Sequence, residues 1–256
     1  MKQPIIDAHI HLDMYSEESR REIMQDLERY HIDGLISVSN HTASAQMNLK
    51  LARQDKRIKP AVGFHPEQEL PDDHQLERIF KLIDEHKEEM VAIGEVGLPY
   101  YSRKKDPSLS LTPYIEMLER FIRLAVKLDK PIILHAIYED ANIACDLLEK
   151  HSVRKVHFHW FKSSPAMIRR LIENRYSISV TPDCLYEAEI QQLIEQYPLE
   201  LMMVETDGPW PFEGEFKNER THPKMIHESI TKISEIKSLP LDEVYKQLYQ
   251  NTVDFF

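Results

Sequence analysis

Six side chains of the types that bind divalent cations are spread through the sequence: His9, His11, Glu95, His135, His159 and Asp207. Imidazole nitrogens and carboxylate oxygens suit Zn²⁺, Mn²⁺ or Mg²⁺. Taken singly, each has a simpler explanation, because a histidine at a strand end is more often a hydrogen-bonded core residue than a ligand. Asp207, which precedes Gly208-Pro209, could serve only a turn. If all six converge, their buried charges must be paired or metal-bound.

The elements that would bring these residues together follow a repeating pattern. A short apolar run, a polar loop and an amphipathic helix alternate along the chain, and they predict eight strands at 5–11, 34–39, 59–63, 90–94, 131–135, 156–159, 176–180 and 201–205. Strands that alternate with helices indicate parallel βαβ units. Eight such units close most simply as an α/β fold of the (β/α)8 barrel type. An open doubly wound sheet is the alternative.

Local signals place several helix ends. Ser16 can cap a helix whose first turn is acidic. Asp72 with Gln75 resembles a capping box. Thr112 and Ser164, each followed by proline, are predicted as N-caps with proline in the first helical position. Two further helices are predicted over 223–237 and 241–254.

The strand ends bring the candidate ligands to one face of this barrel. His9 and His11 end the first predicted strand, and residues two apart on a strand point the same way. The other four follow in order: Glu95 ends the fourth strand, His135 the fifth and His159 the sixth, and Asp207 follows the eighth. Barrel active sites are built at the carboxyl ends of the strands. The sequence therefore predicts a metal centre at that mouth.

Length and composition set further bounds. The 256 residues suit a single barrel domain spanning 1–256. No apolar run reaches the roughly 18 residues of a membrane span, and no secretory signal is expected. Cys145 and Cys184, without a C-x-x-C motif, indicate a reducing compartment and favour a cytoplasmic protein. The net charge of -11 weakens the case for binding long duplex DNA, although two bound metals would add about +4 locally.

A set of short motifs resembles the TatD family of metal-dependent hydrolases. The matching segments, in chain order, are D-A-H-I-H-L-D at 7–13, G-F-H-P at 63–66, I-G-E-V-G-L at 93–98, L-H at 134–135, H-W-F at 159–161 and E-T-D-G-P at 205–209. The H-x-H motif alone is shared with the wider amidohydrolase superfamily. The ordered set, with Glu rather than Lys on the fourth strand, is specific to the TatD pattern.

The resemblance implies two divalent cations and a role for each ligand. One cation would be held by His9, His11 and Asp207, and the other by His135 and His159. Glu95 would bridge the two cations. A water between them would be acidified towards hydroxide at neutral pH, and Asp207 would take its proton as general base.

Two histidines leave alternatives open. His65 is implied as a donor to the substrate or transition state, but it could equally be a structural histidine beside the ligands. His157 competes with His159, because residues two apart share one face of a strand. The family motif, in which the ligand is followed by aromatic residues such as Trp160-Phe161, favours His159.

The residues expected to contact substrate depart from the family pattern. Pro99 replaces the usual Asp, Ile137 the usual Arg, and Thr221 the usual Asn. Cations and aromatics in loops on the same face could compensate: Arg103, Lys104, Lys105 and Lys162, with Phe64, Tyr100, Tyr101, Trp160, Trp210 and Phe212. Such groups suit phosphates and stacked bases. Alternatively, the basic run is a solvated turn and the aromatics pack the rim.

Three functions remain open at this point. The leading hypothesis is a metal-dependent phosphodiesterase or deoxyribonuclease that acts on single-stranded or short nucleic acid. The alternative is a barrel amidohydrolase that cleaves a C–N or ester bond in a small molecule. A non-enzymatic subunit that keeps the metals for structure is the third, and the complete ligand set argues against it.

Overall fold

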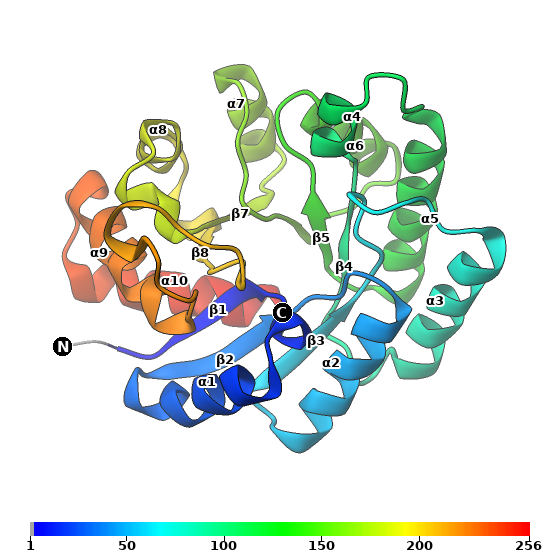
Figure 1. Ribbon diagram of the computed structural model, residues 1–256. Coiled ribbons are helices and arrows are strands. Elements are labelled where there is room, and N and C mark those ends of the chain that lie inside the picture. Colours follow the sequence, from blue (N-terminus) through cyan, green and yellow to red (C-terminus); the bar gives the residue numbers. More distant parts are fainter. Residues whose placement is uncertain (1–2) are drawn as a thin grey trace.

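Eight parallel strands form one sheet in the order in which they occur along the chain. The computed structural model describes residues 3–256, so the first two residues of the domain expected over 1–256 lie outside the described part. The strands are β1 Ile5–Ile10, β2 Ile32–Ser37, β3 Ile58–Val62, β4 Ala92–Gly97, β5 Ile132–His135, β6 Val156–Phe158, β7 Ser177–Val180 and β8 Met202–Val204. Helices surround this sheet on its outer side (Figure 1).

The sheet closes on itself through residues that follow β8. The backbone N–H of Asp207 donates to the carbonyl of His9 at 2.9 Å, and the N–H of His11 donates to the carbonyl of Gly208 at 2.8 Å. The predicted barrel is thus confirmed, and the open doubly wound sheet is excluded because neighbouring strands follow chain order throughout. The closure also places Asp207 beside β1.

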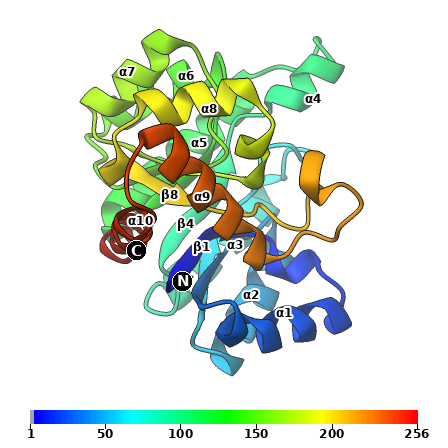
Figure 2. The same cartoon turned by 90° about the vertical axis from the view of Figure 1, so that its left-hand side faces the viewer.

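Ten α-helices lie within the described residues. They are α1 Glu17–Arg29, α2 Thr42–Gln54, α3 Asp73–His86, α4 Tyr100–Lys105, α5 Thr112–Leu128, α6 Asp140–Lys150, α7 Pro165–Glu173, α8 Ala188–Gln196, α9 Ile226–Lys237 and α10 Leu241–Phe255. Most turn an apolar stripe inward, as Leu118, Ile122 and Ala125 of α5 do. Figure 2 shows α4 and the orange segment after β8 on the same side of the barrel.

Most predicted helix caps are confirmed. Ser16 and Ser164 each accept the N–H three residues on, and Asp72 forms a complete capping box with Gln75. The N-cap predicted at Thr112 is wrong by one residue. The first helical hydrogen bond of α5 is accepted by the carbonyl of Leu111, so Thr112 is already helical.

The fourth strand differs most from its predicted range of 90–94. It runs from Ala92 to Gly97, because pairing with β5 continues through Val96 with Leu134 and Gly97 with His135. Glu95 therefore lies inside β4 rather than at its end. His135 ends β5 as predicted, and His159 follows β6 directly.

The core is mainly apolar, but several strands also carry buried polar residues. Apolar side chains fill the space between sheet and helices, with Phe121, Phe158 and Tyr197 among the largest that are fully buried. The buried polar residues of β1, β4 and β6 include His9, Glu95 and His157. Both cysteines are free and buried. Over residues 3–256, no helix is long and apolar enough to cross a membrane.

Candidate metal centre

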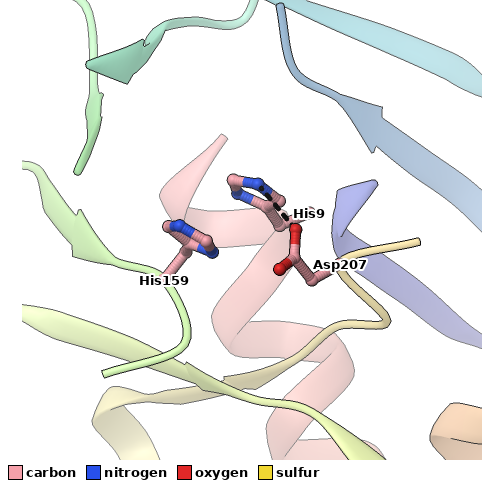
Figure 3. Close-up of side chains that lie close together, drawn as sticks. All are labelled: His9, His159 and Asp207. Atoms are coloured by element: carbon pink, nitrogen blue, oxygen red, sulfur yellow. Dashed lines mark ion pairs between the residues drawn. The ribbon is translucent and has the colours of Figure 1, made fainter. Parts of the chain in front are cut away.

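Four ligand-type atoms from the end of β1, from β4 and from the segment after β8 meet in a compact group. The Nε2 atom of His9 lies 3.2 Å from Glu95 Oε2 and 3.5 Å from Asp207 Oδ1. The Nε2 atom of His11 lies 3.4 Å from each of these oxygens. Figure 3 shows His9 and Asp207 directed at one another, with the ring of His159 beside them. Ligands about 2.1 Å from a tetrahedral cation lie about 3.4 Å apart, so this group has the dimensions of a metal site.

The other oxygen of Glu95 faces a second group of nitrogens. Oε1 lies 2.7 Å from His159 Nε2 and 3.1 Å from His135 Nδ1. The two nitrogens are themselves 3.2 Å apart. Three donor atoms with an open side are typical of catalytic metal positions. A single carboxylate inside β4 thus separates two groups of potential ligands.

The atoms at the centre of both groups lack hydrogen-bond partners. Both oxygens of Glu95, Nε2 of His9 and Oδ1 of Asp207 are buried without one. Leaving such atoms unpaired in the interior is costly. Divalent cations would satisfy all four atoms, so the residues present fit a metal centre. Three overlapping sets of these side chains could each hold an ion: His9, His159 and Asp207; His9, His11 and Glu95; and His65, Glu95 and His135.

The electrostatics of the cluster favour positive charge. Burial raises the pKa of Glu95, but the neighbouring imidazoles, His159 foremost, outweigh burial and hold this pKa well below its usual value. Burial lowers the pKa of His11, but contacts with Asp207 and Glu95 outweigh it and raise this pKa to about 9. In the chain alone, a proton on His11 would balance part of the carboxylate charge. Cations could supply the same charge.

His65 lies beside the cluster with its hydrogen-bonding already partly fixed. Its Nδ1 accepts the backbone N–H of Glu67 at 3.1 Å, and its Nε2 lies 3.2 Å from Glu95 Oε1. A neutral imidazole whose Nδ1 accepts carries its proton on Nε2. A metal ligand needs an unprotonated nitrogen, so this arrangement favours His65 as a hydrogen-bond donor at the cavity rather than as a ligand.

The two histidines of the sixth strand point to different partners. His159 contacts Glu95, whereas His157 Nε2 lies 2.6 Å from the hydroxyl of Ser179. That hydroxyl donates in turn to Glu205 at 2.5 Å. Phe255 and Phe256 pack on the ring of His157. His157 therefore lies in a buried structural network, below the group formed by Glu95 and its neighbours.

Two glutamates around the cluster had no role in the sequence analysis. Glu67 accepts the N–H groups of Tyr101 and Ser102 at 2.7 Å each, and its Oε1 lies 3.5 Å from His135 Nε2. Glu205 accepts the N–H of Trp160 at 2.7 Å and lies 3.6 Å from His159 Nδ1. Carboxylates behind ligand histidines orient the rings. Two features of the sequence could have pointed to these glutamates: Glu67 lies two residues after His65, and Glu205 lies within the E-T-D motif.

A cavity of about 550 Å³ opens over the cluster. Its walls include His11, His65, His135, His159 and Asp207 at the base. Higher up, the lining residues are mainly aromatic or acidic: Tyr101, Trp160, Tyr186, Trp210 and Phe212, with Glu67, Asp183, Glu187 and Glu213. Asp183 follows β7, one of two strands for which no candidate had been proposed, and it accepts the indole N–H of Trp160 at 2.7 Å.

The four predicted substrate-binding cations do not gather around this cavity. Lys105 lines it. Arg103 is paired with Asp140 at 2.8 Å, and both Arg103 and Lys104 border a separate surface depression. Lys162 is buried and held by Glu187 at 2.6 Å, with its ammonium 4.6 Å from the centre of the Trp160 ring. Sequence spacing could not show these acidic partners, which come from other loops.

Comparisons with known proteins agree with this geometry. The chain matches the protein family described as TatD related DNase over residues 6–256. It is 41% identical over 253 residues to an uncharacterized metal-dependent hydrolase of Haemophilus influenzae, covering 98% of this chain and 99% of the relative. It is 26% identical over 261 residues to the human deoxyribonuclease TATDN3, covering 98% and 94%. The crystal structure of YjjV, a TatD homologue from Escherichia coli K12, shares the fold with a TM-score of 0.89 at 24% identity, covering 98% and 97%.

Proposed function

The chain belongs to the family of TatD-related DNases, which are metal-dependent hydrolases, and on this premise we propose that it hydrolyses phosphodiesters with two divalent cations. One observation carries the proposal: the two oxygens of the buried Glu95 face two different groups of nitrogens and oxygens. His9, His11 and Asp207 would complete the first position. His135 and His159 would complete the second.

The metals would supply one part of the chemistry. Divalent cations at these positions act as Lewis acids, neutralise charge on a phosphoryl group and lower the pKa of bound water. Zn²⁺, Mn²⁺ and Mg²⁺ all accept such nitrogen and oxygen ligands.

The chain's own residues would supply the rest. The carboxylate of Asp207 borders the cavity, and it would accept a proton from the attacking water. His65, with its proton on Nε2, would donate to an oxygen of the phosphoryl group. Lys105 on the cavity wall would help to orient the substrate. The aromatic walls would limit access of bulk water.

The direct test is hydrolysis of a substrate panel by metal-loaded protein. The panel contains bis(p-nitrophenyl) phosphate, short single-stranded DNA, and representative amides and lactones. We expect both phosphodiesters to be cleaved and the activity to be lost when a chelator removes the metals. The acidic cavity wall favours a second candidate, an amidohydrolase for a small molecule. Cleavage of an amide or lactone with no cleavage of either phosphodiester would replace the first function with the second.

A further inference from the structure

The upper cavity presents flat aromatic surfaces. Tyr101 and Trp160 stack on one side with ring centres 6.0 Å apart. Trp210 lines the cavity and is 51% exposed, and it is one of the few large apolar side chains that are open to solvent. Exposed aromatic rings beside a catalytic centre can stack with the bases of nucleic acids, each base contributing to binding. An aromatic wall of this kind can bind a planar ring by stacking, without hydrogen bonds to the edge of the ring.

The charge of the same wall is unsuited to a polyanion. Among the described residues, Lys105 is the only lysine or arginine that lines the cavity. Asp183, Glu187 and Glu213 border it as well, and Lys162 neutralises only part of their charge from within the wall. The chain as a whole carries -11. A strand that ran across this mouth would bring its phosphates towards carboxylates.

The volume agrees with a short substrate. About 550 Å³ lies within the range of cavities that enclose one small organic ligand. One nucleotide-sized unit could place its phosphodiester at the cluster and its ring among the aromatic side chains. The remainder of a long strand would have to lie outside the cavity. Lys105 is the one cation that the described cavity wall offers to it.

We propose, building on the phosphodiesterase function proposed above, that the substrate is a short phosphodiester of one or two nucleotide units. It is held by stacking on the exposed ring of Trp210, with Tyr101 and Trp160 forming the aromatic wall beside it, and not by phosphate contacts along a strand. Both tryptophans of the chain line the cavity, so each can serve as a reporter of its occupancy.

Salt dependence separates these two modes of binding. Each phosphate neutralised on a single strand gives a slope of about −0.7 in log affinity against log salt. With Lys105 as the sole contact, a tenfold rise in salt should raise KM for a 12-nucleotide strand about fivefold. Four cations in contact with the strand would raise it several hundredfold.

The experiment measures kcat/KM of the metal-loaded protein for a dinucleotide and for the 12-nucleotide strand at two salt concentrations. We expect values per cleavable bond within about threefold of each other and a shallow salt slope. Trp210→Ala should raise KM for the dinucleotide about tenfold or more with kcat little changed, because stacking on this ring is lost. Val126→Ala, which truncates an exposed apolar side chain of α5 outside the cavity lining, is the control and should leave both constants unchanged.

A binding measurement complements the kinetics. A nucleoside monophosphate should quench the tryptophan fluorescence, and inorganic phosphate at the same concentration should not. A strand favoured over the dinucleotide more than a hundredfold, with its KM rising about a hundredfold or more over the tenfold rise in salt, would overturn the short-substrate proposal while leaving phosphodiester hydrolysis intact. Absence of quenching by the mononucleotide would also overturn it. If neither phosphodiester is cleaved, the underlying function fails and this proposal fails with it.

Discussion

The carboxylate of Asp207 is proposed to serve both as a metal ligand and as a proton acceptor. Its Oδ1 lies 3.4–3.5 Å from His11 and His9, and the side chain also borders the cavity. Asp207→Asn conserves volume but removes the charge and the proton acceptor, so we expect kcat to fall on the order of 10²-fold or more. The free energy of unfolding of this variant should stay close to that of wild type, which would show that the barrel still folds. Asp106→Asn, at an exposed carboxylate between α4 and α5, serves as the control; activity of Asp207→Asn within threefold of wild type would remove this residue from its role.

His159 and His157 provide a matched pair on one strand end. His159 contacts Glu95, and His157 contacts Ser179. We expect His159→Ala to lower metal occupancy at the second position, as measured by metal analysis of the reconstituted protein. His157→Ala should retain the metal and lower the free energy of unfolding, because it empties a buried, hydrogen-bonded position. The opposite pattern would shift the ligand assignment by two residues.

His222 lies away from the cluster and should report on pH. Its Nδ1 accepts the N–H of Lys224, and burial, aided by the charges of Lys224 and Arg220, lowers its pKa to about 4. In the unfolded chain the imidazole takes up a proton near pH 6.5, and this uptake favours unfolding. The contribution of neutral His222 to the free energy of unfolding is therefore complete above pH 6.5 and is lost as the pH falls towards 4. Between pH 7.5 and 5, wild type should lose about 2 kcal/mol more unfolding free energy than His222→Gln. Urea unfolding measures this, with exposed His74→Gln expected to follow wild type; equal losses in wild type and His222→Gln would contradict the neutral buried state.

At the scale of elements, the positions of the ligands depend on close approach between β4 and β5. A Cβ atom at Gly97 would lie 1.9 Å from the carbonyl oxygen of His135. Gly97→Ala should therefore push the strands apart, cost about 1–3 kcal/mol of unfolding free energy and reduce metal occupancy next to His135. Gly34→Ala in β2, where the nearest atom is 3.3 Å away, should change stability by less than about 1 kcal/mol. If Gly97→Ala and Gly34→Ala had equal effects on thermal unfolding and on metal content, the close approach of β4 and β5 at Gly97 would not position the ligands.

The strands and loops differ in how well the sequence predicted them. Strand ends and short motifs predicted the barrel, because period and turn signals are local and parallel strands bring their carboxyl ends to one face. The position of Glu95 inside β4 was missed, since pairing with β5 rather than local composition extends that strand. The roles of Glu67 and Asp183, and the acidic partners of Arg103 and Lys162, depend on contacts between distant loops. No spacing along the chain records such contacts.

At the scale of the molecule, a strongly acidic chain surrounds a cluster that is built for cations. Carboxylates and unpartnered imidazoles at the centre of the barrel fit bound metals, whereas acidic and aromatic residues at the mouth fit a small planar substrate. The barrel supplies both, because the candidate ligands lie in the strands or just after them, and the mouth is formed by the loops that follow. Changes in the loops can therefore alter substrate choice while the metal centre stays the same.

In the proposed metal centre, Glu95 joins two cations within one chain. The most direct test of this centre is metal analysis by mass spectrometry of chelator-stripped protein that has been reconstituted with Mn²⁺ or Zn²⁺ and freed of excess ion. We expect two equivalents per chain for wild type, and fewer than two for Glu95→Gln, because a neutral amide is a poorer ligand for two cations than a carboxylate. A wild-type maximum of one equivalent at saturating metal would contradict the two-cation centre.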